Sequence, residues 1–144
     1  MYLDLDSGIY DVEQGVRYLT ELVEAGNEYA CYYLGKEYVR KESPYYNETK
    51  GIQYLERAKE QGNDWAKYSL GKIYLDKTSS EYRAKLGMQY MTELAESGNE
   101  YAQMKLGFEY LKGGNVARNI FSAYNYFSQA AAQGNQLAEN MMLD

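Results

Sequence analysis

Apolar residues recur along this chain at intervals of three and four, and the whole pattern repeats every 36 residues. Ala30, Leu34 and Tyr38 are four apart, and Ala, Leu and Tyr return together 36 and 72 residues later. A second run, which includes Gly51 and Tyr54, recurs with the same period. Such spacing places apolar side chains on one face of a helix. Each 36-residue unit therefore predicts two short helices.

Gly-Asn pairs mark where one helix should end and the next begin. They stand at Gly26, Gly62, Gly98 and Gly134, each followed by Asn. Glycine can adopt the left-handed conformation that closes a helix, and asparagine is a good N-cap. In three copies an acidic residue follows, which suits the positive end of a new helix.

Glycines inside the helical pattern, Gly35, Gly71 and Gly107, should each cost about 1 kcal/mol relative to alanine. We expect close approach of the partner helix backbone to offset this cost. Variable segments of about ten residues separate the two helices of a unit and are expected to be loops. Because one helix pair cannot bury a face alone, the pairs should stack. The predicted fold class is all-α, an α-α superhelix (solenoid) of antiparallel helix pairs with a 36-residue repeat.

Three strings, AKYSLGKIY, GIQYLERAKEQGN and FSAYNYFSQAAAQGN, resemble the Sel-1-like repeat family, a branch of the tetratricopeptide-like helical repeats. The resemblance covers nearly the whole chain. The loop that begins with Gly113 and Gly114 is similar to the glycine-rich turn of that family, whereas the two earlier loops have no glycine.

The repeat phase predicts one domain over residues 1–144, with units at 28–63, 64–99 and 100–135 and partial units at 1–27 and 136–144. Tyr2 and Leu3 take the places of Tyr38 and Val39, so the chain opens as if a first helix were missing. We interpret the chain as a segment of a longer protein; the alternative is a natural small protein with its own caps. Weak homo-oligomerisation through uncapped ends is expected from apolar residues such as Met141, Met142 and Leu143.

Charge and composition limit the classes of partner that this chain is expected to bind. Lys and Arg total 15 against 21 Asp and Glu, a net charge of −6, and no basic run is present, which disfavours nucleic acid. No apolar stretch of about 18 residues predicts a membrane span, so no membrane partner is expected. The single cysteine, Cys31, excludes an intrachain disulfide, is interpreted as a core thiol and weakly favours a reducing compartment such as the cytoplasm. Localisation is otherwise unreadable from this sequence.

The sequence offers little for catalysis. It has no histidine, one cysteine and no phosphate-binding glycine loop, so no cofactor or metal is expected. Carboxylate pairs such as Glu56 and Glu60 are typical of a solvated helix face. An enzyme is therefore a less favoured function than either an interaction module or an architectural segment.

The resemblance implies that the first helix of each pair lines a concave groove. The face offset from the buried Ala, Leu and Tyr would carry the candidate binding residues Tyr29, Tyr32, Lys36, Trp65, Tyr68, Lys72, Tyr101, Met104 and Phe108. Tyr29, Trp65 and Tyr101 are expected to be partner anchors. Tyr32 and Tyr68 either contact a ligand or pack on the next repeat, and the lysines either bind carboxylates or carbonyls or are merely solvated.

The tyrosines of the second helices, Tyr18, Tyr54, Tyr90 and Tyr126, are expected at interfaces between repeats, with their hydroxyls at a polar edge. The favoured function is a protein-protein interaction module or scaffold that holds a peptide or protein segment in its groove. The alternative is an architectural segment that packs against neighbouring domains or self-associates and binds nothing in trans.

Overall fold

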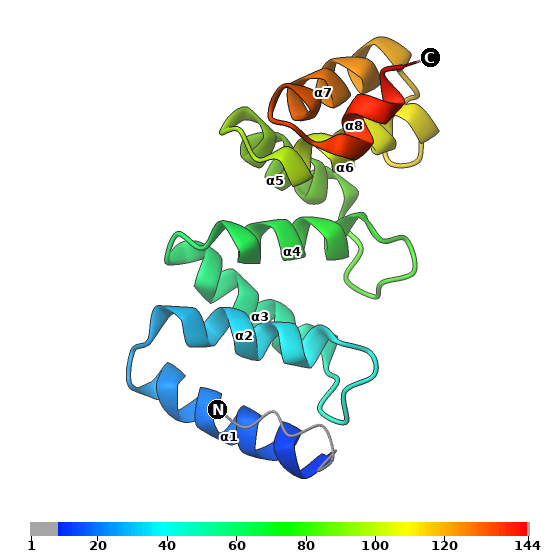
Figure 1. Ribbon diagram of the computed structural model, residues 1–144. Coiled ribbons are helices and arrows are strands. Elements are labelled where there is room, and N and C mark those ends of the chain that lie inside the picture. The colour runs from blue at the N-terminus through cyan, green and yellow to red at the C-terminus, as the bar shows by residue number, and fades with distance from the viewer. Residues whose placement is uncertain (1–8, 144) are drawn as a thin grey trace. The chain divides into compact units, whose positions relative to one another are not determined.

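The computed structural model describes residues 9–143, which form eight α-helices and no strand (Figure 1). In chain order they are α1 (Ile9–Glu24), α2 (Glu28–Val39), α3 (Glu48–Glu60), α4 (Asp64–Leu75), α5 (Ala84–Glu96), α6 (Glu100–Lys112), α7 (Ile120–Ala132) and α8 (Gln136–Met141). Tyr2 and Leu3 lie outside the described residues. The chain divides into two compact units, Met1–Leu70 and Gly71–Asp144, and α4 spans the division.

The Gly-Asn pairs separate the helices as predicted. Gly26, Gly62, Gly98 and Gly134 all have positive φ, between 89° and 97°. The side chain of Asn27 accepts hydrogen bonds from the backbone N–H groups of Tyr29 and Ala30 at 2.9 and 3.1 Å. The other three asparagines cap their helices through the N–H of Ala66, Ala102 and Ala138. Each pair therefore ends one helix and starts the next, which is a purely local effect.

In the first unit, α2 and α3 pack antiparallel. A Cβ atom built on Gly35 would lie 2.8 Å from Leu55, and one built on Gly51 would lie 2.5 Å from Val39, so residue numbers increase along one helix as they decrease along the other. Leu34 and Leu55 are fully buried. Val16 of α1 joins Leu34 and Tyr38 in one core cluster. Cys31 is buried and forms no disulfide, as expected for a core thiol.

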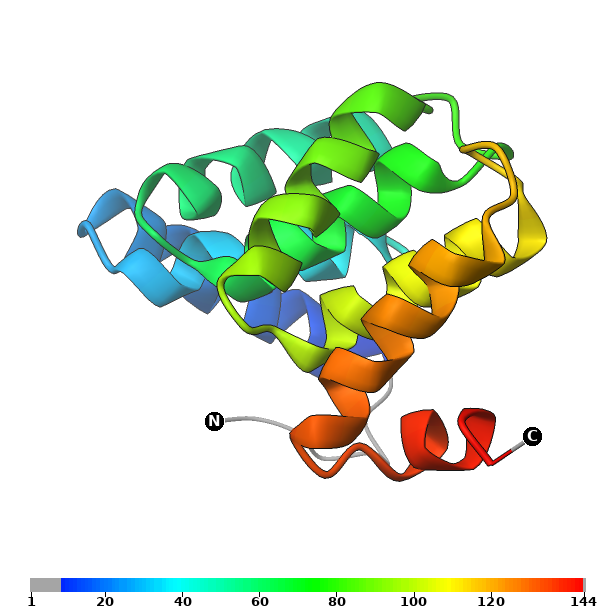
Figure 2. The same ribbon diagram turned by 90° about the horizontal axis from the view of Figure 1, so that it is seen from above.

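The second unit repeats this arrangement. The end of α4 lies antiparallel to α5, because Gly71 faces Met91 and Gly87 faces Leu75. α6 packs against α5 and α7, and the short α8 packs against α7 (Figure 2). Phe127 of α7 is fully buried and forms a cluster with Met104, Ala123, Ala130 and Ala138. The all-α class of antiparallel helix pairs is confirmed.

The helical glycines do admit their neighbours closely, but not always through the backbone. At Gly35 the backbone carbonyl of Gly51 would lie 3.0 Å from an added Cβ, which confirms the expected approach. At Gly71 and Gly107 the three nearest atoms all belong to side chains, those of Met91, from 2.8 Å, and Phe127, from 2.5 Å. Glycine therefore makes room in these two helices for a large side chain of the next helix.

Tyrosine rings pair between the two helices of a single 36-residue repeat. Tyr38 stacks on Tyr54 with centroids 5.8 Å apart, and Tyr110 stacks on Tyr126 at 5.9 Å. Tyr74 and Tyr90 form a tilted pair at 5.9 Å. These ring contacts lie within a repeat, and contacts of the same tyrosines between repeats stay a prediction. Burial, the neighbouring Tyr110 and the carboxylate of Glu96 raise the pKa of Tyr126 above its ordinary value.

The loops that join the two helices of a 36-residue repeat are closed by the same backbone hydrogen bond in three repeats. The carbonyl oxygens of Tyr38, Tyr74 and Tyr110 accept from the backbone N–H groups nine residues later, at 2.8, 2.9 and 3.0 Å. Those later residues are the N-caps of α3, α5 and α7. Asn47 and Asn119 cap through their side chains, whereas Arg83 makes no side-chain cap bond.

Arg83→Asn is expected to raise the free energy of unfolding. The new cap should contribute about 1 kcal/mol. Loss of the Arg83 guanidinium over the Tyr74 ring, 5.7 Å from its centroid, should remove about 0.5 kcal/mol of this gain. Urea denaturation followed by circular dichroism measures the net increase. The reverse change at the matched position, Asn119→Arg, should lower stability by about 1 kcal/mol; an equal effect of both variants would contradict the capping argument.

Candidate functional site

One repeat position keeps a large aromatic side chain half exposed in three first helices. Tyr29, Trp65 and Tyr101 each occupy the second residue of α2, α4 or α6, and they are 60%, 51% and 47% exposed. The alanine that follows each of them is buried. The Asn cap sets this orientation, because it fixes the direction of the first helical turn and aims the alanine at the core.

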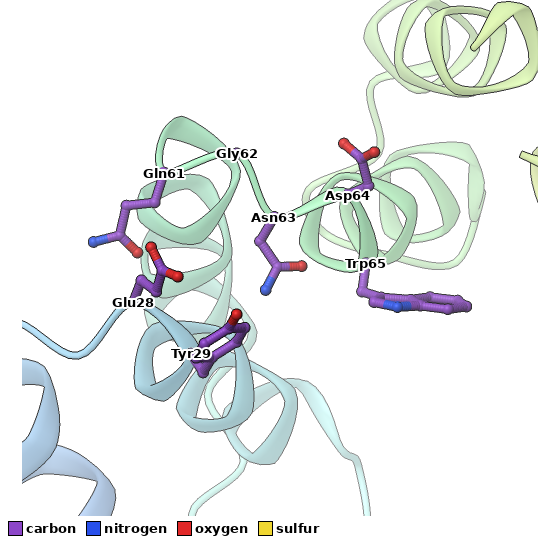
Figure 3. Close-up of a pocket in the computed structure, with 7 residues that line it drawn as sticks. All are labelled: Glu28, Tyr29, Gln61, Gly62, Asn63, Asp64 and Trp65. Carbon is purple, nitrogen blue, oxygen red and sulfur yellow. The ribbon is translucent and has the colours of Figure 1, made fainter. Parts of the chain in front are cut away.

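In the first unit, Tyr29 and Trp65 flank a pocket of about 230 Å³ between the start of α2 and the turn that joins α3 to α4. Figure 3 shows its lining, which comprises Glu28, Tyr29, Gln61, Gly62, Asn63, Asp64 and Trp65. Trp65 extends from the first turn of α4, and its ring meets Tyr68 edge-on at 6.4 Å. Two aromatic and two acidic residues therefore line one small pocket, and none of its described lining residues is basic; the Asp64 carboxylate and the Trp65 ring point away from Tyr29 (Figure 3).

The other predicted residues of the first unit, Tyr32, Lys36 and Tyr68, do not line this pocket. Tyr32 is half-buried, and the Nζ atom of Lys36 lies 5.3 Å from the centroid of its ring. Tyr68 is half-buried beside Trp65. A lysine over an aromatic face is a cation-π contact worth about 0.5–1 kcal/mol at an exposed site. Lys36 thus has a structural partner of its own.

In the second unit the structure separates the predicted residues by burial. Tyr101 is exposed, but Met104 is only 8% exposed and belongs to the core cluster around Phe127. Phe108 is half-buried, and its ring meets Phe127 edge-on at 5.1 Å. Met104 and Phe108 therefore stabilise the α6–α7 contact, and a partner could reach Tyr101 but not Met104. Lys72 lines a different pocket, within residues 71–144.

Sequence reasoning missed the turn itself. Gln61, Gly62 and Asn63 were interpreted only as a helix boundary, yet they form one wall of the pocket. A signal was present, because an acidic residue, an aromatic residue and the Gly-Asn turn keep a constant spacing. The spacing could have placed the turn beside the aromatic side chain of the preceding helix.

No cluster of three or more Cys, Asp or Glu side chains suited to a metal ion occurs among residues 9–143. Glu56 and Glu60 both lie 3.4 Å from the Nζ atom of Lys59, so these carboxylates form ion pairs on a helix surface. Across the same residues, every helix is too short or too polar to cross a membrane.

The repeated helix pairs and capped turns define a helical-repeat protein of the solenoid class. The chain belongs to the Sel1 repeat family: the family model matches residues 28–63 and 100–135, together half of the chain. Sel1 repeats are generally protein-interaction modules and act as non-enzymatic scaffolds. No curated protein matches the sequence.

Solved structures support the same class. Protein c5321, a protective antigen present in uropathogenic Escherichia coli strains that displays an SLR fold, is 25% identical, with a TM-score of 0.74 over 88% of this chain. This chain spans only 27% of c5321. A Sel1 repeat protein from Oxalobacter formigenes is 24% identical, with a TM-score of 0.72 over 82% of this chain and 90% of that one.

Helicobacter pylori cysteine rich protein B (hcpB) shares the fold at 20% identity, with a TM-score of 0.66 over 94% of this chain and 97% of that one. In contrast to the cysteine-rich name of that protein, this chain has one cysteine. Its helices are therefore held together by packing, without disulfides inside the chain.

Proposed function

We propose that this protein binds segments of another protein on the first helices of its repeats, with Tyr29 and Trp65 as anchors in the first unit and Tyr101 as an anchor in the second. The observation that carries the proposal is the half exposure of three large aromatic side chains at one repeat position. Aromatic residues are common anchors of protein interfaces because they bury a large area at a small entropic cost. Tyr32, Lys36 and Tyr68 belong to the proposed surface as surrounding contacts, whereas Lys72 lines the separate pocket of the second unit.

The pocket beside Tyr29 favours a particular side chain of the partner. Aromatic faces attract cations, and the carboxylate of Glu28 beside Tyr29 adds negative charge to the lining (Figure 3). A lysine or arginine could lay its aliphatic stem on the Tyr29 ring and its charge near this carboxylate. The net charge of −6 would also speed the approach of a basic segment. The preferred ligand is therefore a peptide that carries a basic residue among apolar ones.

Selection from a displayed random peptide library tests this proposal. The parent chain should enrich a peptide family with a basic residue, and the Tyr29→Ala/Trp65→Ala variant should bind those peptides at least about tenfold more weakly. The matched control, Tyr33→Ala/Tyr46→Ala, removes two exposed tyrosines of the same unit that do not line the pocket. Fluorescence polarisation measures the affinities after circular dichroism shows equal helix content.

The architectural alternative makes a different prediction for the same experiment. Leu137 and Leu143 are exposed near α8, which would favour self-association. In that case no peptide family would be enriched, or both double variants would lose binding equally, and sedimentation would show a mass that rises with concentration.

A further inference from the structure

A second pocket, of about 500 Å³ and wholly within residues 71–144, gathers lysines from three separate segments. Lys72 comes from the last turn of α4, Lys77 from the loop that follows, and Lys105 and Lys112 from α6. Two carboxylates, those of Asp76 and Glu109, also line it. The lining thus carries a local excess of positive charge in a chain whose net charge is −6.

Asn115 holds this pocket together. Its side-chain amide donates to the backbone oxygen of Leu75 at 3.0 Å and to the carboxylate of Glu109 at 2.8 Å. Its amide oxygen accepts from the Tyr82 hydroxyl. The loop after α6 is therefore tied both to the end of α4 and to the loop after α4, and Figure 2 shows the two loops side by side. The lysines are brought together by a defined hydrogen-bond network.

The two carboxylates already have partners inside the fold. Glu109 is only 2% exposed and accepts from Asn115. Asp76 accepts from the backbone N–H of Thr78 at 2.9 Å and from its hydroxyl at 2.6 Å. In the part of the chain that the structure describes, Lys77, Lys105 and Lys112 form no ion pair. Like charges that share a pocket repel one another, and an anion placed among them would relieve that repulsion.

We propose that this pocket binds the carboxylate side chains of an acidic peptide segment of a protein partner. Lysine is a compact charge on a flexible stem, so Lys77, Lys105 and Lys112 can adjust to carboxylates at several spacings along a peptide. The volume lies in the range of pockets that enclose small ligands, which leaves room for a few acidic side chains. This site stands independently of the aromatic pocket in the first unit.

The overall negative charge restricts how such a segment is recognised. Beyond a Debye length of about 8 Å at physiological salt, the net charge is largely screened, so the lysines act mainly on carboxylates that enter the pocket. Binding should weaken steeply as salt is added. A short acidic stretch should therefore be preferred over a partner with dispersed negative charge.

Fluorescence polarisation with the full chain and a labelled hexaglutamate peptide tests the proposal, with hexaglutamine as the neutral probe. Hexaglutamate should bind and hexaglutamine should not. The Lys105→Gln/Lys112→Gln variant should bind hexaglutamate about tenfold more weakly, because two charge-assisted contacts are lost. The control Lys41→Gln/Lys85→Gln changes the net charge equally at two exposed lysines outside the pocket and should bind within about twofold of the parent.

Four results would overturn the proposal: no binding of hexaglutamate, equal binding of hexaglutamine, equal losses in the two double variants, or full displacement by inorganic phosphate, which would indicate a small-anion site. Circular dichroism of both variants shows whether they fold. The Tyr29→Ala/Trp65→Ala variant should bind hexaglutamate like the parent, so failure of the aromatic site and failure of this one are distinguishable.

Discussion

Phe127→Ala is expected to lower the free energy of unfolding by about 3–5 kcal/mol. The Phe127 side chain is fully buried in the cluster that joins α6, α7 and α8. Its ring meets Phe108 at 5.1 Å and fills the space that the absent side chain of Gly107 leaves open. Removal of the ring would leave a cavity that its neighbours on the same helix, Ala123 and Ala130, are too small to fill. The loss should therefore lie in the range of large-to-small core substitutions.

Urea denaturation followed by circular dichroism measures this loss, with Phe121→Ala as the control. Phe121 lies on the same helix and is 89% exposed, so its replacement should change stability by less than about 0.5 kcal/mol. The sole tryptophan, Trp65, lies in the first unit and reports separately on that unit. Similar losses in the two variants would contradict the assignment of Phe127 as the central residue of this core.

Gly51→Ala is expected to lower the free energy of unfolding by about 2 kcal/mol. The added Cβ would lie 2.5 Å from Val39 Cγ1 and 2.9 Å from the backbone oxygen of Gly35. The valine can rotate only at a cost, and the backbone oxygen belongs to a helix that would have to move. This strain should exceed the gain of about 1 kcal/mol that alanine brings to a helix interior.

Gly15→Ala provides the matched control, because Gly15 occupies the same position in the preceding 36-residue repeat. A Cβ there would meet no described atom within 4 Å. The helix propensity of alanine should then raise stability by about 0.5–1 kcal/mol. The same substitution is thus expected to have opposite signs at two equivalent positions. Equal signs in urea denaturation would show that the helix contact at Gly51 does not decide its residue type.

The helix boundaries were predictable because they depend on local chemistry. A left-handed glycine and an asparagine cap act within one turn of chain, so Gly62 and Asn63 indicate the boundary without knowledge of any neighbour. The buried face of α2 followed from the spacing of Ala30 and Leu34 for the same reason.

The candidate sites were less predictable, because side chains at one helical spacing can meet different neighbours. Tyr101 and Met104 were assigned to a single face, yet only Tyr101 is exposed, since Phe127 of α7 packs over Met104. The lysine pocket could not be inferred, because Lys72 and Lys112 are 40 positions apart. They line one pocket, and the hydrogen bond from Asn115 to the backbone oxygen of Leu75 ties the loop after α6 to the end of α4.

The sequence by itself therefore determined the repeat, the helix pairs, the capped turns and the family. It also determined where exposed aromatic residues recur, because each is the second residue of a helix that an asparagine caps. Only the tertiary structure decided which members of a helix face are covered and which charges meet. Coverage of a side chain by a neighbouring helix and the approach of distant charges depend on contacts between helices, which the period of a single helix does not specify.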